Sequence, residues 1–176
     1  MTWLSFSDIQ EGMKISIMAV WLLCCLSLMA GSKKSDKLVV QFNLQGAESD
    51  GPKMSVPQEV AGTRVFFRLS PAISTIDIES FRPFPAADGA TYGVLFKLNR
   101  TGARRLSALT NANQGKLFLA RLNGRVCDVV EIDSPINDGM LVIWQDVRTQ
   151  EVAALDMMIP RIGQTVQEWK KQKKQK

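Results

Sequence analysis

The chain reads YGVLFKLNRTGARRLSALTNANQGKLFLARLNGRVCDVVEIDSPINDGMLVIWQDVRTQEVAALDMMI from Tyr92 to Ile159, and this stretch decides the fold. Its apolar spacing and its turn residues predict a strand, a helix, two paired strands, a further strand and a helix, in that order. The predicted strands are residues 92–98, 116–122, 125–132 and 140–144, and the predicted helices are residues 101–113 and 149–158.

The ends of these elements carry recognisable signals. Thr101 and Thr149 can each cap the start of a helix, and Gly115 can take the left-handed conformation that ends the first one. The Asn123-Gly124 pair predicts a two-residue hairpin turn, because both residues tolerate a positive φ. The apolar stripes are Ala103, Leu106 and Leu109 on the first helix and Val152, Leu155 and Ile159 on the second, and we expect Leu106, Leu109, Val152 and Leu155 to be buried under the two helices. We therefore predict an α+β fold in which two helices cover one face of a mostly antiparallel sheet.

Upstream of this stretch the pattern is weaker. Residues 38–44 and 63–69 have strand character, and a further strand is predicted around residues 76–81. Residues 45–59 contain glycine, proline and polar side chains, which predicts a long loop. We also expect residues 82–90 to interrupt the pairing, because Pro83 and Pro85 cannot donate ladder hydrogen bonds.

The N-terminal residues predict export. Lys14 precedes an uncharged run, Ile15–Ala30, and small residues follow it, as in a secretory signal. We expect cleavage near Ala30 and Ser32 and a periplasmic location. Because Asp8 and Glu11 are unusual in an export signal, we expect residues 13–32 to be the true signal. An uncleaved inner-membrane anchor is the alternative, although the run is shorter than the roughly 20 residues that span a bilayer.

The predicted domain organisation follows from these segments. Residues 1–32 form the signal, residues 33–59 an N-terminal strand and polar loop, residues 60–160 the α+β domain, and residues 161–176 a basic tail. The net charge is +5, yet the last seven residues alone contain five lysines. Such a tail is usually solvated, and contact with an anionic membrane is the alternative. The rest of the chain is nearly neutral, which argues against nucleic-acid binding.

Residues 92–159 resemble the periplasmic head of the protein-export accessory subunit SecD. The resemblance is carried by the pieces Gly102-Ala103, Leu109-Thr110, Asn113-Gln114-Gly115-Lys116-Leu117, Leu122-Asn123-Gly124-Arg125-Val126 and Ile132–Gly139, in this order and spacing. It implies the head fold, a periplasmic location and contact with polypeptide clients or an envelope partner. Because no hydrophobic run follows Ala30, we expect a head-like module that is exported without the membrane motor of that family.

Enzyme chemistry is restricted by composition. The chain has no histidine, which excludes a Ser-His-Asp triad and any zinc site that contains histidine. Cys127 would be the one cysteine left after processing, so no intramolecular disulfide is expected, and its strand spacing predicts a packed thiol. We expect neither a cofactor nor a metal. A small periplasmic hydrolase that uses carboxylates is the alternative, with candidates Asp128, Glu131, Asp133 and Asp138.

The predicted binding residues are Phe84, Asp88 and Asp138. A sheet with helices on one face leaves the other face or a strand edge free, and an extended polypeptide can add to an edge through main-chain hydrogen bonds. Phe84, between two prolines, is the candidate for an adjacent apolar contact, unless it folds back onto the core. Asp88 and Asp138 each precede a glycine, which is also the pattern of a turn.

Overall fold

The computed structural model describes residues 37–174, so the predicted signal region with Ala30 and Ser32 lies outside the described residues. The strands are β1 (Val40–Leu44), β2 (Ser55–Val60), β3 (Thr63–Arg68), β4 (Ile73–Ser74), β5 (Ile78–Pro85), β6 (Tyr92–Leu98), β7 (Leu117–Leu122), β8 (Arg125–Glu131) and β9 (Met140–Val147). The helices are η2 (Glu48–Asp50), η3 (Thr75–Asp77), α2 (Arg100–Ala112), α3 (Thr149–Met158) and α4 (Val166–Lys174).

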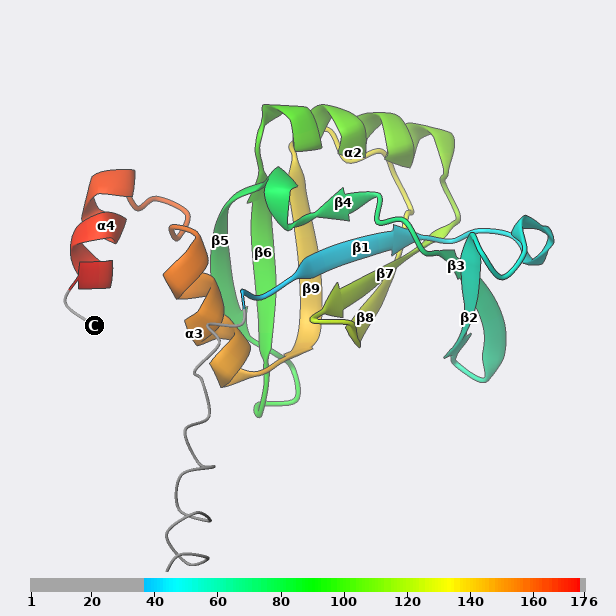
Figure 1. Ribbon diagram of the computed structural model, residues 1–176, viewed down its shortest axis with the longest axis horizontal. Coiled ribbons are helices and arrows are strands. Elements are labelled where there is room, and N and C mark those ends of the chain that lie inside the picture. Colours follow the sequence, from blue (N-terminus) through cyan, green and yellow to red (C-terminus); the bar gives the residue numbers. More distant parts are fainter. Residues whose placement is uncertain (1–36, 175–176) are drawn as a thin grey trace, which may run out of the picture. The chain divides into compact units, whose positions relative to one another are not determined.

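The strands pair in antiparallel fashion, and the predicted α+β class is confirmed (Figure 1). They are divided among three sheets rather than one, with strand orders β4-β1-β7-β8, β5-β6-β9 and β2-β3. The edges of β8 and β9 adjoin without a backbone ladder. Instead, the Asp128 carboxylate accepts a hydrogen bond from Trp144 N at 2.7 Å. A side chain therefore replaces the backbone pairing that would have joined the two larger sheets.

The main core lies between these two larger sheets and the helices. Phe42 of β1 and Phe96 of β6 meet edge to face, with ring centroids 6.1 Å apart. Helix α2 adds Leu106 and helix α3 adds Leu155, both fully buried, and Val152 of α3 is also buried. Burial of these three predicted core residues is confirmed, whereas Leu109 is half-buried and packs against the margin of the core.

Both N-terminal helix caps predicted from the sequence are wrong, whereas Gly115 after the first helix has the expected positive φ, 78°. Helix α2 begins one residue earlier, and Asn99 caps it by accepting a hydrogen bond from Gly102 N at 2.9 Å. The Asn99 amide also donates to Ile76 O at 2.9 Å, so the cap joins α2 to η3. Helix α3 follows Arg148, whose N–H donates to the Glu151 carboxylate at 2.8 Å. A contact across the fold accompanies the observed cap of α2, whereas the capping contact of α3 is local to its first turn.

The Asn123-Gly124 turn is confirmed, with φ of 50° and 80° at its two residues. The expected interruption at residues 82–90 is wrong, because β5 continues to Pro85. Strand β5 is the edge of its sheet, and Phe81 N donates away from β6, to Pro160 O at 3.1 Å. Backbone N–H groups alternate in direction along a strand, so the backbone positions of Pro83 and Pro85 face away from β6, as Phe81 N does. Their missing N–H groups therefore leave no acceptor of β6 unpaired. Proline is therefore tolerated at these positions.

The loop predicted over residues 45–59 is also partly wrong, because it includes the strand β2 and the short helix η2. Strand β2 pairs with β3 alone, and the two-residue turn at Ala61 and Gly62 has positive φ at both positions. Pro57 lies opposite Phe66 in this hairpin. The hairpin packs through the fully buried Phe67, which lies outside the main core cluster.

The residues predicted as a solvated tail include helix α4. Thr165 begins it with a reciprocal cap, in which Thr165 N donates to the Glu168 carboxylate at 2.9 Å and Glu168 N donates to Thr165 Oγ1 at 3.3 Å. The lysines of α4 are nevertheless exposed. None of the helices between residues 37 and 174 is both long and apolar enough to span a membrane.

Candidate functional site

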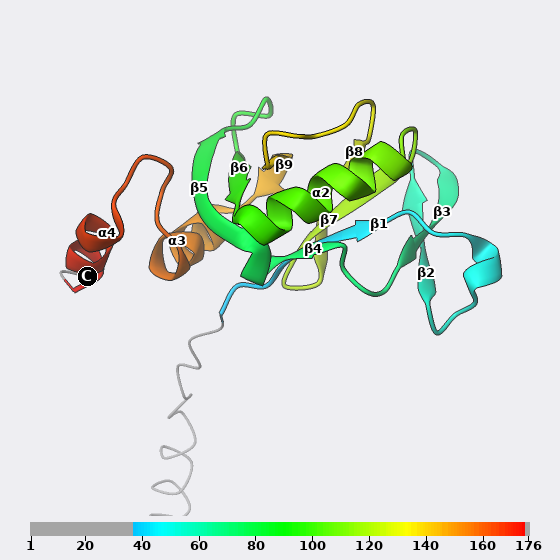
Figure 2. The ribbon, with the colours of Figure 1, turned by 90° about the horizontal axis from the view of Figure 1, so that it is seen from above.

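The candidate site is the outward face of the β5-β6-β9 sheet. Along β6, Val94, Phe96 and Leu98 point into the core, so strand alternation turns Leu95 and Lys97 outward. Helices α2 and α3 lie on the core side of this sheet (Figure 2). We call the outward surface the open face, and it consists of Arg82, Phe84, Leu95, Lys97, Met140, Val142 and Trp144.

An aromatic pair forms the most prominent feature of the open face. Phe84 of β5 and Trp144 of β9 meet edge to face, with ring centroids 6.1 Å apart and an interplanar angle of 70°. Trp144 is 58% exposed, and Phe84 is half-buried. Phe84 thus folds onto the sheet, but onto its outward face rather than into the core. A large aromatic surface remains in contact with solvent.

Gly93 of β6 lies beneath this pair. It is directly opposite Phe84 in the β5–β6 register. A Cβ at this position would lie 2.3 Å from the Phe84 ring and 2.7 Å from Trp144 O. A side chain here would displace Phe84 or the backbone of β9, and the aromatic pair therefore depends on a glycine.

The backbone of β9 fixes Trp144. Trp144 N donates to Asp128 of β8 at 2.7 Å, and the β6–β9 register shifts between Tyr92 and Val94. Two residues beyond Trp144, Asp146 has a positive φ of 59°. The site therefore sits at a bulge, a feature that redirects a side chain. Trp144 was not predicted from the sequence, because the run Met140–Trp144 is apolar on both faces of the strand and does not show which residue is exposed.

Charged groups border the apolar part of the open face. Lys97 lies 3.4 Å from Glu79 in an exposed ion pair, and Arg82 is exposed on β5. Leu95 of β6 lies opposite Arg82 on one side and opposite Val142 of β9 on the other, and both Leu95 and Val142 are half-buried. The arrangement is an apolar centre with a polar margin, as in protein-binding surfaces.

The two predicted aspartates serve as turn formers at opposite ends of β6. Asp88 accepts hydrogen bonds from Ala90 N and Thr91 N, both at 2.9 Å, and from Thr91 Oγ1 at 2.6 Å. These bonds, first that of the Thr91 hydroxyl, hold the pKa of Asp88 below its usual value. Asp138 accepts from Met140 N at 2.9 Å. Neither carboxylate is brought to the aromatic pair.

Two further carboxylates of the alternative hydrolase hypothesis, Asp128 and Asp133, also have structural partners, whereas Glu131 is exposed at the end of β8. Asp128 accepts from Val129 N at 2.8 Å as well as from Trp144 N, and Asp133 accepts from Ser134 Oγ at 3.1 Å. Burial raises the pKa of the Cys127 thiol to about 11, so the thiol is protonated near neutral pH. Within residues 37–174, no group of three or more metal-ligating side chains is arranged to hold an ion.

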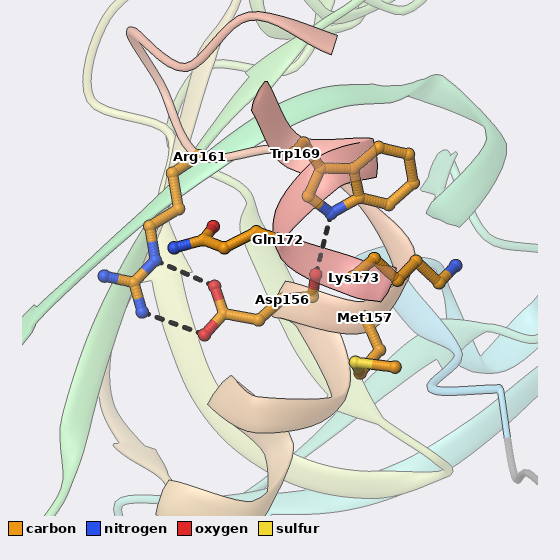
Figure 3. A pocket seen from close by; sticks show the side chains of 6 residues that line it. All are labelled: Asp156, Met157, Arg161, Trp169, Gln172 and Lys173. Atoms are coloured by element: carbon orange, nitrogen blue, oxygen red, sulfur yellow. Dashed lines mark hydrogen bonds and ion pairs between the residues drawn. The ribbon is translucent and has the colours of Figure 1, made fainter. Parts of the chain in front are cut away.

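A second concave feature lies between α3 and α4. It is a pocket of about 170 Å³ lined by Asp156, Met157, Arg161, Trp169, Gln172 and Lys173 (Figure 3). Arg161 donates twice to the Asp156 carboxylate, at 2.8 and 2.9 Å, and Trp169 Nε1 donates to Asp156 O at 2.8 Å. Its polar groups are therefore used to attach α4 to α3.

Comparison with known proteins agrees with this fold. One solved structure, of the membrane component SecDF that enhances protein export, is 15% identical with a TM-score of 0.50, over 88% of this chain and 68% of that chain. A structure of SecDF in its super-membrane-facing form is 17% identical with a TM-score of 0.49, over 86% of this chain and 20% of that chain. The chain thus spans one fifth of the second protein. No curated protein sequence matches.

The chain also matches a known sequence family over most of its folded part. The pattern of the SecDF P1 head subdomain matches residues 53–161, which is more than half of the chain. The match begins upstream of residues 92–159, in which the resemblance was seen in the sequence. It includes the hairpin β2–β3, all strands of the two larger sheets except β1, and helices α2 and α3. The chain therefore belongs to the SecDF P1 head subdomain family.

Proposed function

We propose that this protein is a non-enzymatic binding module that holds extended polypeptide against the open face of the β5-β6-β9 sheet. The observation that carries the proposal is the Phe84–Trp144 pair, which leaves Trp144 58% exposed on a face that no helix within residues 37–174 covers. Membership of the SecDF P1 head family supports a role in protein translocation, since SecDF enhances protein export.

The chemistry of the open face suits a sequence-tolerant client. Aromatic rings bury a large area against any apolar side chain and need little directional bonding. Leu95 and Val142 extend this apolar area, and Arg82 and Lys97 border it. An unfolded segment exposes apolar side chains at short intervals, so it can always present one to the aromatic pair. Affinity would be modest, with selectivity for apolar over strongly charged segments.

The face is a better binding surface than the edge that the sequence first suggested. On the outer edge of β5, Phe81 already bonds to the segment at residues 160–162. Farther along, Pro83 and Pro85 have no N–H to donate to an added strand. Strand addition at β5 would therefore lack half of its main-chain hydrogen bonds, whereas side-chain contact on the face needs none of them.

The proposal is tested by titrating a fluorescently labelled unfolded peptide that is rich in leucine and valine, with anisotropy as the readout. The wild type is expected to bind in the micromolar range. Replacing Trp144 or Phe84 with Ala should weaken binding at least about tenfold, because such buried aromatic anchors are worth about 2 kcal/mol or more. Ile76→Ala is the matched control, since Ile76 is 81% exposed but lies outside the open face.

All four proteins must melt at similar temperatures for the comparison to stand. If the wild type, Trp144→Ala and Phe84→Ala bind the peptide with equal affinity, the open face is not the binding surface. Absence of binding by the wild type at high micromolar peptide would contradict the client-holding function itself.

The proposed place of action is the periplasm, with residues 13–32 as a signal that is cut near Ala30 or Ser32 and the folded part from β1 onward, which includes the predicted domain of residues 60–160, as the working domain. The P1 head family and the uncharged run Ile15–Ala30 support this proposal. Mass spectrometry of the mature N-terminus should find a first residue between Gly31 and Lys33. An intact Met13 in the membrane fraction would favour the anchored alternative, and a cytoplasmic protein would contradict both.

A further inference from the structure

Helix α4 is held on the domain by its own contacts with α3. Trp169 Nε1 donates to Asp156 O at 2.8 Å, and the Asp156 side chain receives two bonds from Arg161 (Figure 3). Gln172 accepts from Gln164 Nε2 at 2.8 Å, which ties the helix to the preceding turn. The side of α4 that carries Trp169 and Gln172 therefore faces α3, and the remaining side chains of the helix are exposed, with Lys173 at the margin of the pocket.

Those remaining side chains are strongly basic. Lys170, Lys171, Lys173 and Lys174 are all exposed. In the part of the chain that the structure describes, none of these four lysines lies within ion-pair distance of a carboxylate. The one acidic residue of the helix, Glu168, is bonded to Thr165 at its first turn. Four positive charges thus lie within five consecutive residues with no internal neutralisation.

Apolar side chains accompany these charges. Val166 at the start of α4 is 54% exposed, and Met157 of α3 is 41% exposed beside the pocket that Lys173 lines. Lys173 Nζ lies 4.9 Å from the centre of the Trp169 ring, so its stem follows the helix surface. Lysines combined with exposed apolar residues are typical of surfaces that lie on a bilayer, where charge meets headgroups and apolar groups enter the interface.

The chain also joins the domain at the same helix. Leu38 N, at the start of the described residues, lies 3.1 Å from Met158 Sδ at the end of α3. In the sequence, the uncharged run Ile15–Ala30 precedes this point. The N-terminal entry and the basic helix are therefore both attached to α3, which places them on one side of the domain.

We propose that the exposed side of α4 binds the surface of an anionic phospholipid bilayer. Each lysine that approaches such a surface adds favourable energy, and the helix presents four of them in a fixed arrangement. A nucleic acid is a poorer fit, because single-strand readers combine basic groups with free aromatic faces and Trp169 is bound to α3. Binding to the bilayer would orient the domain and does not depend on the open face.

Lysine footprinting on the full chain tests this proposal at the level of single residues. The protein is mixed with vesicles of equal amounts of phosphatidylcholine and phosphatidylglycerol, or of phosphatidylcholine alone, then acetylated briefly and analysed by peptide mass spectrometry. Acetylation at Lys170, Lys171, Lys173 and Lys174 should slow at least about fivefold on the anionic vesicles only, because charge attraction requires the anionic lipid. Lys53 and Lys116 are exposed internal controls that should not change.

A variant with all four lysines replaced by Gln supplies the second measurement. Its affinity for the anionic vesicles should fall on the order of a hundredfold, and wild-type protection should disappear in high salt. The matched control replaces Lys53, Arg64, Arg104 and Lys116 with Gln, which removes the same charge elsewhere and should bind like the wild type.

Three outcomes would overturn the proposal. The first is equal protection of the α4 lysines on both kinds of vesicle. The second is protection of Lys53 and Lys116 on the anionic vesicles that equals the protection of the α4 lysines. The third is binding of a short DNA oligonucleotide as tightly as the anionic vesicles, because this would reveal a general polyanion site. Because the footprint reports each lysine separately, attachment of the N-terminal segment to the vesicles does not conceal the result.

Discussion

Leu106 and Leu109 lie on the same stripe of α2 in the sequence, but the fold buries them unequally. Leu106 is fully buried within the main core cluster, whereas Leu109 is half-buried at its margin. Leu106→Ala should therefore lower the free energy of unfolding by about 2–5 kcal/mol, the range for a fully buried leucine that leaves a cavity. Leu109→Ala, the matched control on the same helix, should cost clearly less. Urea denaturation measures both, and equal losses would show that the core extends over Leu109.

Cys127 provides a second test at the scale of one residue. Burial raises the pKa of its thiol to about 11, and the thiolate is the reactive form. At pH 8, alkylation of the native protein should be about a hundredfold slower than that of a free cysteine, whose pKa is about 8.5. Mass spectrometry of the peptide that contains Cys127 separates it from Cys24 and Cys25. Equally rapid alkylation in the native state and in urea would contradict the burial.

The same thiol affects stability in alkaline solution. Its folded pKa is raised above the unfolded value, so folding favours the protonated form. The corresponding stability is fully present below the unfolded pKa of about 8.5 and is lost as the pH rises through that value toward about 11. Cys127→Ser should reduce this part of the alkaline destabilisation, as measured by urea denaturation between these two pH values.

At the scale of the elements, the start of α2 distinguishes the observed cap from the predicted one. Asn99 accepts from Gly102 N and donates to Ile76 O, whereas Thr101 is exposed in the first turn. Asn99→Ala should lower the free energy of unfolding by about 1–2 kcal/mol, because both a cap and a bond to η3 are lost. Thr101→Ala should change it by less than about 0.5 kcal/mol. The reverse order in thermal or urea unfolding would favour Thr101 as the cap.

At the scale of the whole molecule, an ion cluster connects the two larger sheets. Arg125 of β8 donates to the Asp146 carboxylate, to Asp146 O at 2.7 Å and to the Glu151 carboxylate at 2.7 Å. The cluster joins β8, β9 and the first turn of α3 where the backbone ladder is missing. The Glu151 side chain is only 14% exposed, and Arg125 is the cation with which it pairs.

Arg125→Met should therefore lower the free energy of unfolding by about 1–3 kcal/mol, since the bonds are to charged groups and Glu151 would be left without its cation. Lys97→Met is the control, because Lys97 and Glu79 are 45% and 53% exposed and such a pair is worth about 0–1 kcal/mol. Denaturation in urea compares the two variants. If both lose the same amount, the cluster does not hold the sheets together.

Sequence alone determined the elements whose signals are local. The predicted bounds of β6 and α3 agree with the structure, and the Asn123-Gly124 turn lies where it was expected. These features depend on periodicity within a few residues and on backbone conformations that few residue types adopt. Their order along the chain was enough to predict an antiparallel α+β fold and the family resemblance.

Only the tertiary structure decided where the edges and uncovered faces lie. Pro83 and Pro85 looked like interruptions, but at a sheet edge their missing N–H groups cost no ladder bond. Strand β9 is apolar on both faces, so its sequence could not show that Trp144 is exposed. The contact between Trp144 and Phe84 joins residues far apart in the chain and depends on the register over Gly93. Strand order and register arise from packing between distant segments, which is why local patterns predicted the elements but not the candidate site.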